Sequence, residues 1–146
     1  MPFPGTRVFH EGWEAHHQPV AEGTMTATGA VWRHSSTKVF NEVTGKSEYP
    51  DPTAVYGEPD RAPMRVVRDG VETTVMIGER QVVKRNYIVT LPAAAPEILV
   101  NDEIRVATAG ADELLPGESL WVLDPRLGSL IWERDLLCTN VPPANR

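Results

Sequence analysis

Cysteine is almost missing from this sequence of 146 residues, since Cys138 is its only one. A single cysteine excludes an intrachain disulfide and any zinc site built on several thiolates. The chain also lacks an apolar run of about 18 residues, the length that a helix needs to cross a bilayer. Its first residues, Met1 to Gly5, lack the basic and apolar regions of a secretory signal peptide. We therefore expect one domain held by its own core, with no contact to a membrane.

Positive charge is scarce and dispersed. The chain has 14 lysines and arginines against 20 aspartates and glutamates, so its net charge is −6, and Lys84-Arg85 is its only adjacent pair of cations. Proteins that bind nucleic acid by themselves normally carry a basic patch or stripe. The charge balance therefore disfavours an autonomous nucleic-acid binder and suits a soluble chain that does not adhere to phosphate backbones.

Signatures of catalysis and metal binding are also missing. The four histidines are His10, His16, His17 and His34. A metalloprotease helix needs His-Glu-x-x-His, whereas His10-Glu11 is followed by Glu14. Ser119 lacks the second glycine of a nucleophile elbow, Cys138 lies in an apolar segment, and neither glycine-rich phosphate loop occurs. We expect no catalytic residue, no metal and no cofactor, and we expect that the protein is not an enzyme.

Proline and glycine, by contrast, are abundant, with 13 and 11 residues spread along the chain. Between them lie short segments of alternating apolar and polar residues, a pattern typical of short strands and turns. The longest such stretch comprises residues 81–91 and 98–108, joined by the segment from Pro92 to Pro96. The core side chains predicted from its alternation are Tyr87, Val89, Leu91, Ile104 and Val106. The sequence predicts a mainly β fold, a small antiparallel β-barrel or sandwich with a short N-terminal helical arm and long loops.

Three regions are predicted along the chain. Residues 1–22 form an N-terminal arm, whose short helix is expected over residues 8–18 and ends before Pro19. Residues 23–138 form the β-barrel domain, and residues 139–146 form a C-terminal tail that contains prolines.

The arm carries aromatic side chains that lie outside the predicted β domain. They are Phe3, Phe9 and Trp13. Arms of this type often become ordered only on a partner. We therefore predict that these three side chains bind another protein surface.

A second apolar feature lies between two glycines in the middle of the chain. Asp69-Gly70 is a turn dipeptide, and residues 70–79 then carry Val75, Met76 and Ile77 in succession. This apolar group fits a strand, and it fits equally a loop tip that contacts another surface. An ordinary hairpin is as compatible with the pattern as a binding loop.

The tryptophans leave a second class of function open. They are spread over the chain as Trp13, Trp32, Trp121 and Trp132. Exposed rings on a small β-barrel can stack on bases, so the alternative is a small β-barrel module that binds nucleic acid or another ligand. We expect Trp121 and Trp132 to fill the core instead.

The order of turn and strand motifs along the chain resembles that of one protein family. Trp13 and His16-His17 precede the first predicted strand. The motifs that follow are VTG at 43–45, TAVYG at 53–57, Arg61, GERQ at 78–81, YIVTLP at 87–92, VNDEI at 100–104, LPGESLWV at 115–122 and ERDLLC at 133–138. This series resembles the head-to-tail connector proteins, of the head-closure or stopper type, of long-tailed phages that infect actinobacteria. Asn101 stands where that family usually has a glycine, and asparagine also tolerates a left-handed backbone.

The resemblance implies a β-barrel subunit of a ring that lies below the portal and adaptor rings, retains the packaged DNA and docks the tail. Related closure proteins project a loop into the channel, so Val75, Met76 and Ile77 are expected to face the channel or the tail. Residues 1–22 are expected to contact a neighbouring subunit or the adjacent ring. The implied partners are further copies of the chain, a portal or adaptor ring and a tail terminator or tail tube protein, with passive contact to DNA. The implied location is the head–tail junction of a virion assembled in a bacterial cytoplasm.

Overall fold

The structure, a computed structural model, describes residues 11–59, 61–127 and 132–144. The helix of this part of the chain is α1 (Trp13–Gly23). The strands that follow are β1 (Ala27–Arg33), β2 (Val39–Asn41), β3 (Lys46–Glu48), β4 (Thr53–Tyr56), β5 (Ala62–Ile77), β6 (Arg80–Pro92), β7 (Glu103–Ala109), β8 (Ser119–Pro125) and β9 (Glu133–Thr139). The prediction of a mainly β, antiparallel fold with a short N-terminal helix is confirmed.

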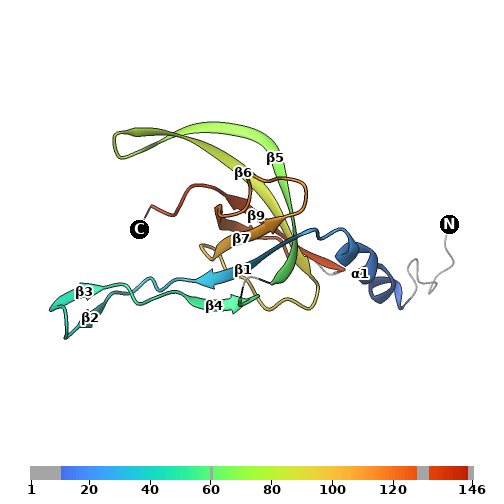
Figure 1. Cartoon of the computed structure of the whole chain (residues 1–146), viewed down its shortest axis with the longest axis horizontal. Helices are drawn as coiled ribbons and strands as arrows, with labels where there is room; N and C mark the ends of the chain where they lie inside the picture. The colour runs from blue at the N-terminus through green and yellow to red at the C-terminus, as the bar shows by residue number, and fades with distance from the viewer. Residues whose placement is uncertain (1–10, 60, 128–131, 145–146) are drawn as a thin grey trace, which may run out of the picture.

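Backbone pairing joins most of the strands into a ring (Figure 1). β1 pairs with β5, and the order continues through β6, β9, β8 and β7. β7 then pairs with β1 from Ala27 to Trp32, which returns the series to its start. All of these pairings are antiparallel, and β4 adds to the C-terminal half of β1. Ring closure leaves fewer free sheet edges than an open sheet of the same strands would have.

The interior of the ring is apolar because each of its strands turns alternate side chains inward. The buried cluster contains Ala27, Val31, Met64, Val89, Leu91, Ala95, Ile98, Ile104, Val106, Leu120, Val122, Leu136 and Cys138. The predicted core positions Val89, Leu91, Ile104 and Val106 belong to it, and Tyr87 packs against it while partly buried. The alternation in residues 81–108 therefore identified the core side of this stretch correctly.

β1 and β7 come unusually close where their register shifts between Thr28 and Gly29. A Cβ atom on Gly29 would lie 2.2 Å from the carbonyl oxygen of Arg105. Only glycine fits this position, so the pairing that closes the ring depends on it. Asn101, which precedes β7, has a φ of 70°, as expected for a residue that replaces a glycine.

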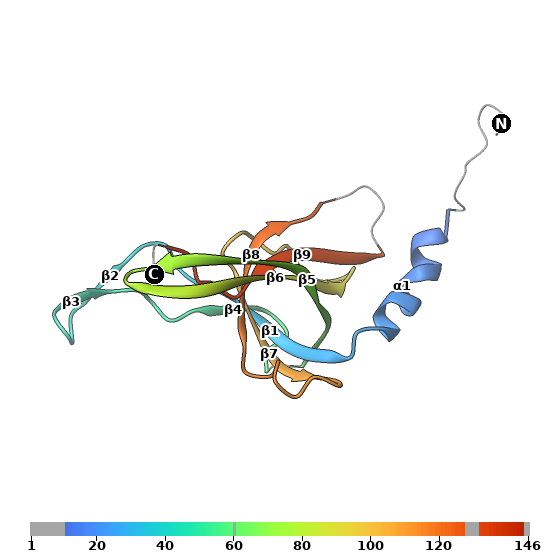
Figure 2. The same ribbon diagram turned by 90° about the horizontal axis from the view of Figure 1, so that it is seen from above.

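The β5–β6 hairpin extends well beyond the ring (Figures 1 and 2). β6 pairs with β9 from Asn86 to Pro92, whereas its pairing with β5 continues to the end of the hairpin at Ile77 and Arg80. The register shifts between Asp69 and Glu72, which marks a β-bulge. The predicted turn at Asp69-Gly70 is therefore wrong, because the bulge accommodates these residues inside one long strand.

The segment proposed as a loop is likewise mostly strand. Val75, Met76 and Ile77 belong to β5 and pair with Val82, Gln81 and Arg80, and the turn is confined to Gly78 and Glu79. Runs of β-branched residues on both sides of the turn explain this outcome, since they favour extended backbone over a loop.

The helix lies further along the chain than predicted. The expected range was 8–18, of which residues 8–10 lie outside the described residues, while α1 runs from Trp13 to Gly23 and contains Pro19. Anchors on both sides of the proline explain why it does not end the helix. Trp13 packs on Trp132 before it, and Ala21 is buried after it. These contacts offset the one backbone hydrogen bond that proline removes.

A small separate sheet projects from the ring on the side away from α1 (Figure 1). It consists of β2 and β3, paired from Val39 with Glu48 to Asn41 with Lys46. The predicted turn at Val43-Thr-Gly45 joins them, with a φ of 66° at Gly45. Asn41 stabilises this turn, because its side chain accepts a hydrogen bond from the backbone N–H of Val43 at 2.9 Å.

Candidate interaction surfaces

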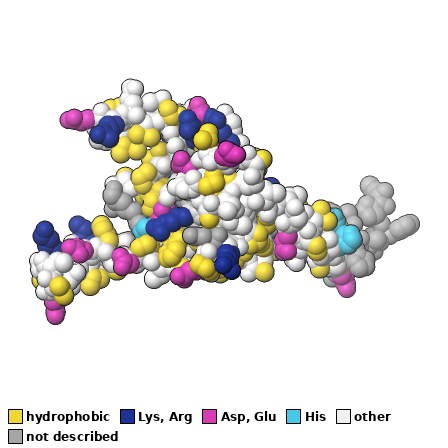
Figure 3. Space-filling view, viewed as in Figure 1, with side chains coloured by type: hydrophobic (Ala, Val, Ile, Leu, Met, Phe, Trp, Pro, Cys, Tyr) yellow, Lys and Arg dark blue, Asp and Glu magenta, His cyan; other side chains and the backbone are white. Residues whose placement is uncertain are grey.

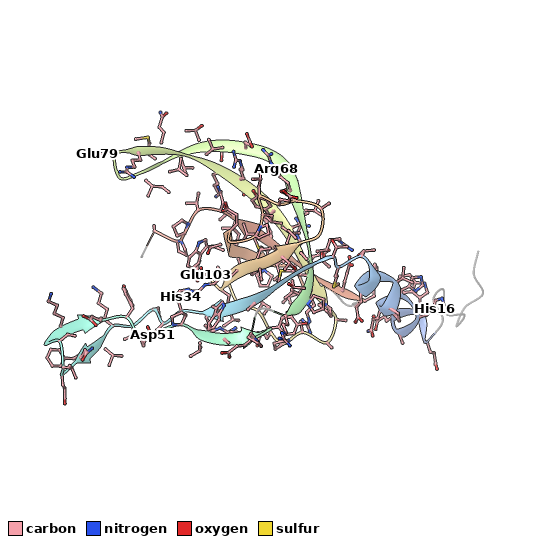
Figure 4. The ribbon with its side chains drawn as sticks, viewed as in Figure 1. His16, His34, Asp51, Arg68, Glu79 and Glu103 are labelled. Carbon is pink, nitrogen blue, oxygen red and sulfur yellow. The ribbon has the colours of Figure 1, made fainter. Side chains whose placement is uncertain are left out.

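The outer part of the β5–β6 hairpin, residues 72–85, is called the hairpin tip below. Figure 4 shows Glu79 at its end, far from the ring that carries Glu103. Gly78 has a φ of 61° as the first residue of the turn, the geometry that glycine favours in two-residue hairpin turns. At its base, the Asn140 side chain accepts a hydrogen bond from the Arg85 N–H at 2.8 Å and donates one to the Val83 carbonyl at 3.1 Å. The chain after β9 thus fixes where the tip leaves the ring.

The hairpin tip has two different faces, because directly opposed residues of antiparallel strands point to the same side. One side, called the basic face, carries Thr73, Val75, Ile77, Arg80, Val82 and Lys84. The other side carries Glu72, Thr74, Met76, Gln81, Val83 and Arg85. Val75, Met76 and Ile77, predicted together as one contact group, are therefore divided. Val75 and Ile77 lie on the basic face, and Met76 lies on the opposite face with 61 % of its surface exposed.

Charges are also distributed unequally between these faces. Glu72 forms ion pairs with Arg68 and with Arg85, whose Nε lies 3.2 Å from its carboxylate. Within the described part of the chain no carboxylate pairs with Arg80 or Lys84, the two cations of the basic face. The basic face therefore combines apolar side chains with uncompensated positive charge.

The β2–β3 sheet forms the second exposed apolar surface. A groove of about 490 Å³ lies along it and is called the acidic groove. Its lining consists of Val39, Phe40, Asn41, Glu42, Glu48, Tyr49, Pro50 and Asp51. Phe40 is 62 % exposed and Val43, at the adjoining turn, is 94 % exposed. Three of the lining residues are carboxylates and none is a cation, although Lys38 approaches the Tyr49 ring to 5.3 Å at the margin.

Figure 3 shows both projecting segments at the same end of the molecule. The surface is hollowed between the hairpin tip and the β2–β3 sheet, and hydrophobic atoms are exposed on both. α1 lies at the opposite end of the molecule (Figures 1 and 2). The two ends therefore offer different surfaces.

Of the three predicted partner-binding residues, Trp13 lies in the described part of the chain. Phe3 and Phe9 lie outside the described residues. Trp13 is half-buried, since its ring meets Trp132 edge-on at 4.8 Å between centroids and lies 4.1 Å from the His17 ring. Trp13 therefore attaches α1 to Trp132, the residue before β9, and does not stand out as a solvent-exposed contact residue.

Trp132 and Trp121, predicted as core residues, are both only half-buried. Trp132 contacts Trp13 of the helix. The Trp121 side chain lies on the outside of the closed sheet, with its indole 5.2 Å from the His34 imidazole. Smaller aliphatic side chains fill the interior instead, because inward positions on strands this close leave little room for an indole.

Two buried carboxylates connect β1 with β7 and β8. Asp102 is 2 % exposed, and its oxygens accept hydrogen bonds from Nε and Nη2 of Arg33 at 3.0 and 2.9 Å. It also accepts one from the Leu99 N–H at 2.9 Å. Glu103 accepts hydrogen bonds from Arg105 at 3.1 Å and from the Ser119 hydroxyl at 2.7 Å. Its Oε2 lies 2.6 Å from Nε2 of His34, and Figure 4 shows the two side chains together.

The electrostatics of this cluster favour a structural role. Burial alone raises the pKa of Glu103, but hydrogen bonds from Arg105, Ser119 and His34 outweigh it and hold the pKa below its usual range. A carboxylate that stays ionised and has its oxygens occupied is a poor general acid or base at neutral pH. The hydrogen bonds from Arg33 to Asp102 raise the pKa of the Arg33 guanidinium in spite of its partial burial. The cluster therefore fastens the ring closure.

The remaining reactive groups are also enclosed or dispersed. Burial raises the pKa of the Cys138 thiol to about 12, so the thiolate, which is the nucleophilic form, is not populated at neutral pH. Across residues 11–59, 61–127 and 132–144, no group of three or more His, Cys, Asp or Glu side chains is arranged to hold a metal ion. His10 lies outside these ranges. The described helix, with 11 residues, is also too short to span a bilayer.

The acidic groove was not anticipated from the sequence. Val39 and Phe40 lie in the short strand β2, and both side chains are exposed. The available signal was the position of this apolar pair in an otherwise polar stretch, next to the Gly45 turn and the Pro50-Asp-Pro52 break. A strand of three residues in such a stretch has little chance of reaching a core.

Comparison with known proteins identifies the family. The chain matches a family of unknown function, DUF6093, over residues 17–139, which includes every strand of the ring. The protein therefore belongs to the DUF6093 family. No match was found among characterised proteins.

Proposed function

We propose that this protein is a structural virion protein that forms a ring at the head–tail junction of a long-tailed phage. The observation that carries the proposal is the difference between the two ends of the molecule. α1 stands at one end, and the hairpin tip and the β2–β3 sheet project at the other. Copies that join through unlike surfaces form rings when the rotation closes. The motif order described above supports the same function.

In this role the ring closes the DNA channel after packaging and docks the tail. Its partners are other copies of the chain, the portal or adaptor ring, and a tail terminator or tail tube protein. The N-terminal arm with Phe3, Phe9 and the helix that Trp13 anchors provides contacts at one end. The hairpin tip provides a surface directed to the channel or the tail, with Met76 and Val83 exposed on the face opposite the basic face.

Contact with DNA is passive in this proposal. The net charge of −6 disfavours tight binding to phosphates, and Arg68 and Arg85 are paired with Glu72. A channel wall of this kind lets DNA slide without holding it.

Gene inactivation in the phage that encodes the chain tests the function. We expect DNA-packaged heads that lose their DNA, together with unattached complete tails, in electron micrographs of the lysate. Supplying the intact chain from a plasmid should restore joined particles. Normal infectious particles without the protein would refute the proposal. Tight, salt-dependent DNA binding by the purified protein would favour the alternative, a nucleic-acid-binding module.

A shortened chain that begins at residue 11 tests the arm separately. It keeps α1 and every described strand but lacks Phe3 and Phe9. We expect a folded protein with an unchanged circular dichroism spectrum that does not restore joined particles in the complementation assay. Full restoration would remove the arm from the proposed contacts.

A further inference from the structure

The hairpin tip and the acidic groove are complementary in both polarity and charge. The basic face of the tip presents Ile77, 42 % exposed, between Arg80 and the half-buried Val75 and Val82. The groove presents Phe40, 62 % exposed, beside the lining carboxylates Glu42, Glu48 and Asp51, while Val39, 58 % exposed, lies on the opposite face of the β2–β3 sheet from Phe40. Apolar surface with cations on one side thus matches apolar surface with carboxylates on the other.

Neither surface is fully covered by its own chain. β2 and β3 form a sheet of two strands that pairs with no other described strand, and two-stranded hairpins alone are marginally stable in water. The hairpin tip lies beyond the last pairing of β6 with β9. Figure 1 shows the two segments projecting as separate arms, and Figure 3 shows the hollow between them. The tip of one chain therefore does not fill the groove of the same chain.

We propose that the basic face of the hairpin tip binds in the acidic groove of a second copy of this chain. Ile77 and Val75 contact the exposed ring of Phe40. Arg80 and Lys84 face the carboxylates Glu42, Glu48 and Asp51 of that copy. This interface deepens the proposed ring and rests on it, because it joins two unlike surfaces and repeats from copy to copy.

The division of the tip into two faces makes this contact compatible with the channel-facing or tail-facing role. The basic face is occupied by the neighbouring copy. Met76 and Val83 lie on the opposite face and remain available. Tip and groove also order each other, since each gains the apolar cover that its own chain does not provide.

Charge reversal in two variants provides a decisive test. One variant carries Arg80→Glu and Lys84→Glu, so that both its tip and its groove are acidic. The other carries Glu42→Lys, Glu48→Lys and Asp51→Lys, so that both are basic. Each variant alone should associate at least about tenfold more weakly than the unchanged chain, because like charges then meet. An equimolar mixture should recover association, since each acidic tip meets a basic groove and each basic tip meets an acidic one. Sedimentation velocity of concentrated protein measures this.

Disulfide trapping tests the same contact by position. Native Cys138 is buried and does not compete, so Ile77→Cys in one chain and Phe40→Cys in another should give a disulfide-linked dimer on mild oxidation. Ile77→Cys mixed with Glu22→Cys, an exposed position in α1, is the matched control and should give little dimer.

The outcomes separate the interface from the ring. Recovery in the mixed charge variants, with selective trapping of the 77–40 pair, supports the proposal. Association that is insensitive to charge reversal, with no selective trapping, overturns this interface while leaving the ring intact. Absence of any association between copies also overturns the interface, and the gene-inactivation experiment then decides the function independently.

Discussion

The interior of the strand ring and the two projecting segments use similar residues in opposite ways. Inside the ring, Leu91, Ile104 and Met64 have no exposed surface, and antiparallel neighbours enclose them on every side. On the hairpin tip and the β2–β3 sheet, Met76 and Phe40 are more than half exposed. Both regions contain large apolar side chains, but only those of the first region are enclosed by their own chain.

This difference separates the folding stability of one chain from the proposed assembly of several. Burial of apolar surface stabilises the ring within one chain, at roughly 25 cal/mol per Å² removed from water. The projecting segments leave such surface in water, so their stabilisation becomes available only when another molecule covers it. Substitutions in the two regions should therefore affect different measurements.

Leu91→Ala should have the largest effect on folding. Its side chain is fully buried in the cluster, so removal leaves a cavity and costs about 2–5 kcal/mol of unfolding free energy. Urea denaturation followed by tryptophan fluorescence measures the loss. Leu114→Ala is the control, because Leu114 is 87 % exposed and its loss should change stability by less than about 0.5 kcal/mol. Equal effects of the two would contradict the assignment of the core.

Asp102→Asn should cause the second-largest loss of unfolding free energy. The change removes the charge that holds the Arg33 guanidinium by two hydrogen bonds and that also accepts the Leu99 N–H. The expected loss is about 2 kcal/mol, discounted because more than a third of the Arg33 side chain is exposed. Asp124→Asn, at an exposed position, should leave the urea midpoint unchanged.

Glu103 should make the ring sensitive to acid. Its folded pKa is lowered, so its contribution to stability is present above the usual glutamate pKa of about 4.3 and is lost as pH falls through the folded value. The unfolded chain takes up the proton first, which favours unfolding at low pH. Glu103→Gln should therefore lower stability at pH 7 and flatten the decline between neutral and acidic pH. Urea midpoints over this range test the slope, and an unchanged slope would assign the acid sensitivity to other groups.

Trp13→Leu should have a smaller, local effect. It keeps apolar bulk but removes the edge-on contact with Trp132, which costs about 1 kcal/mol. Hydrogen exchange should accelerate in α1 and stay unchanged in β6 and β9. Val20→Ala serves as control, because Val20 is 67 % exposed and its loss should leave exchange in α1 nearly as it is.

Phe40→Ser combined with Ile77→Ser should have the smallest effect on folding. Phe40 is 62 % and Ile77 42 % exposed, so the unfolding free energy should change by less than about 0.5 kcal/mol. Association between copies should nevertheless weaken, which sedimentation of the same sample reports. A large loss of stability would instead show that each segment supports its own chain, and the contrast between the two regions would fail.

Sequence reasoning was most reliable where the signal is local. Alternation between residues 81 and 108 identified Val89, Leu91, Ile104 and Val106 as inward-facing, and the glycine at 45 marked a real turn. It was weaker where tertiary contacts override local preference. Pro19 indicated a helix end, but α1 continues through it because side chains on both sides of the proline pack on the β domain. Asp69-Gly70 indicated a turn, but these residues lie at a bulge within β5.

The contacts that close the ring could not be read from the sequence at all. His34 and Glu103 are 69 residues apart, as are Arg33 and Asp102, and no periodicity links such positions. The exposure of Phe40 was equally hidden, because a short apolar strand has the same composition whether it is buried or projects into solvent.

By itself, the sequence determined the class of fold, the inward side of the main strands and the position of the Gly45 turn. These properties depend on residues close together in the chain, whose backbone preferences and alternation act locally. Only the tertiary structure decided that β7 closes on β1 and which carboxylates are buried with their partners. It also decided that the hairpin tip and the acidic groove stay exposed. Those outcomes depend on contacts between distant residues, and a side chain is buried only when another part of the fold reaches it.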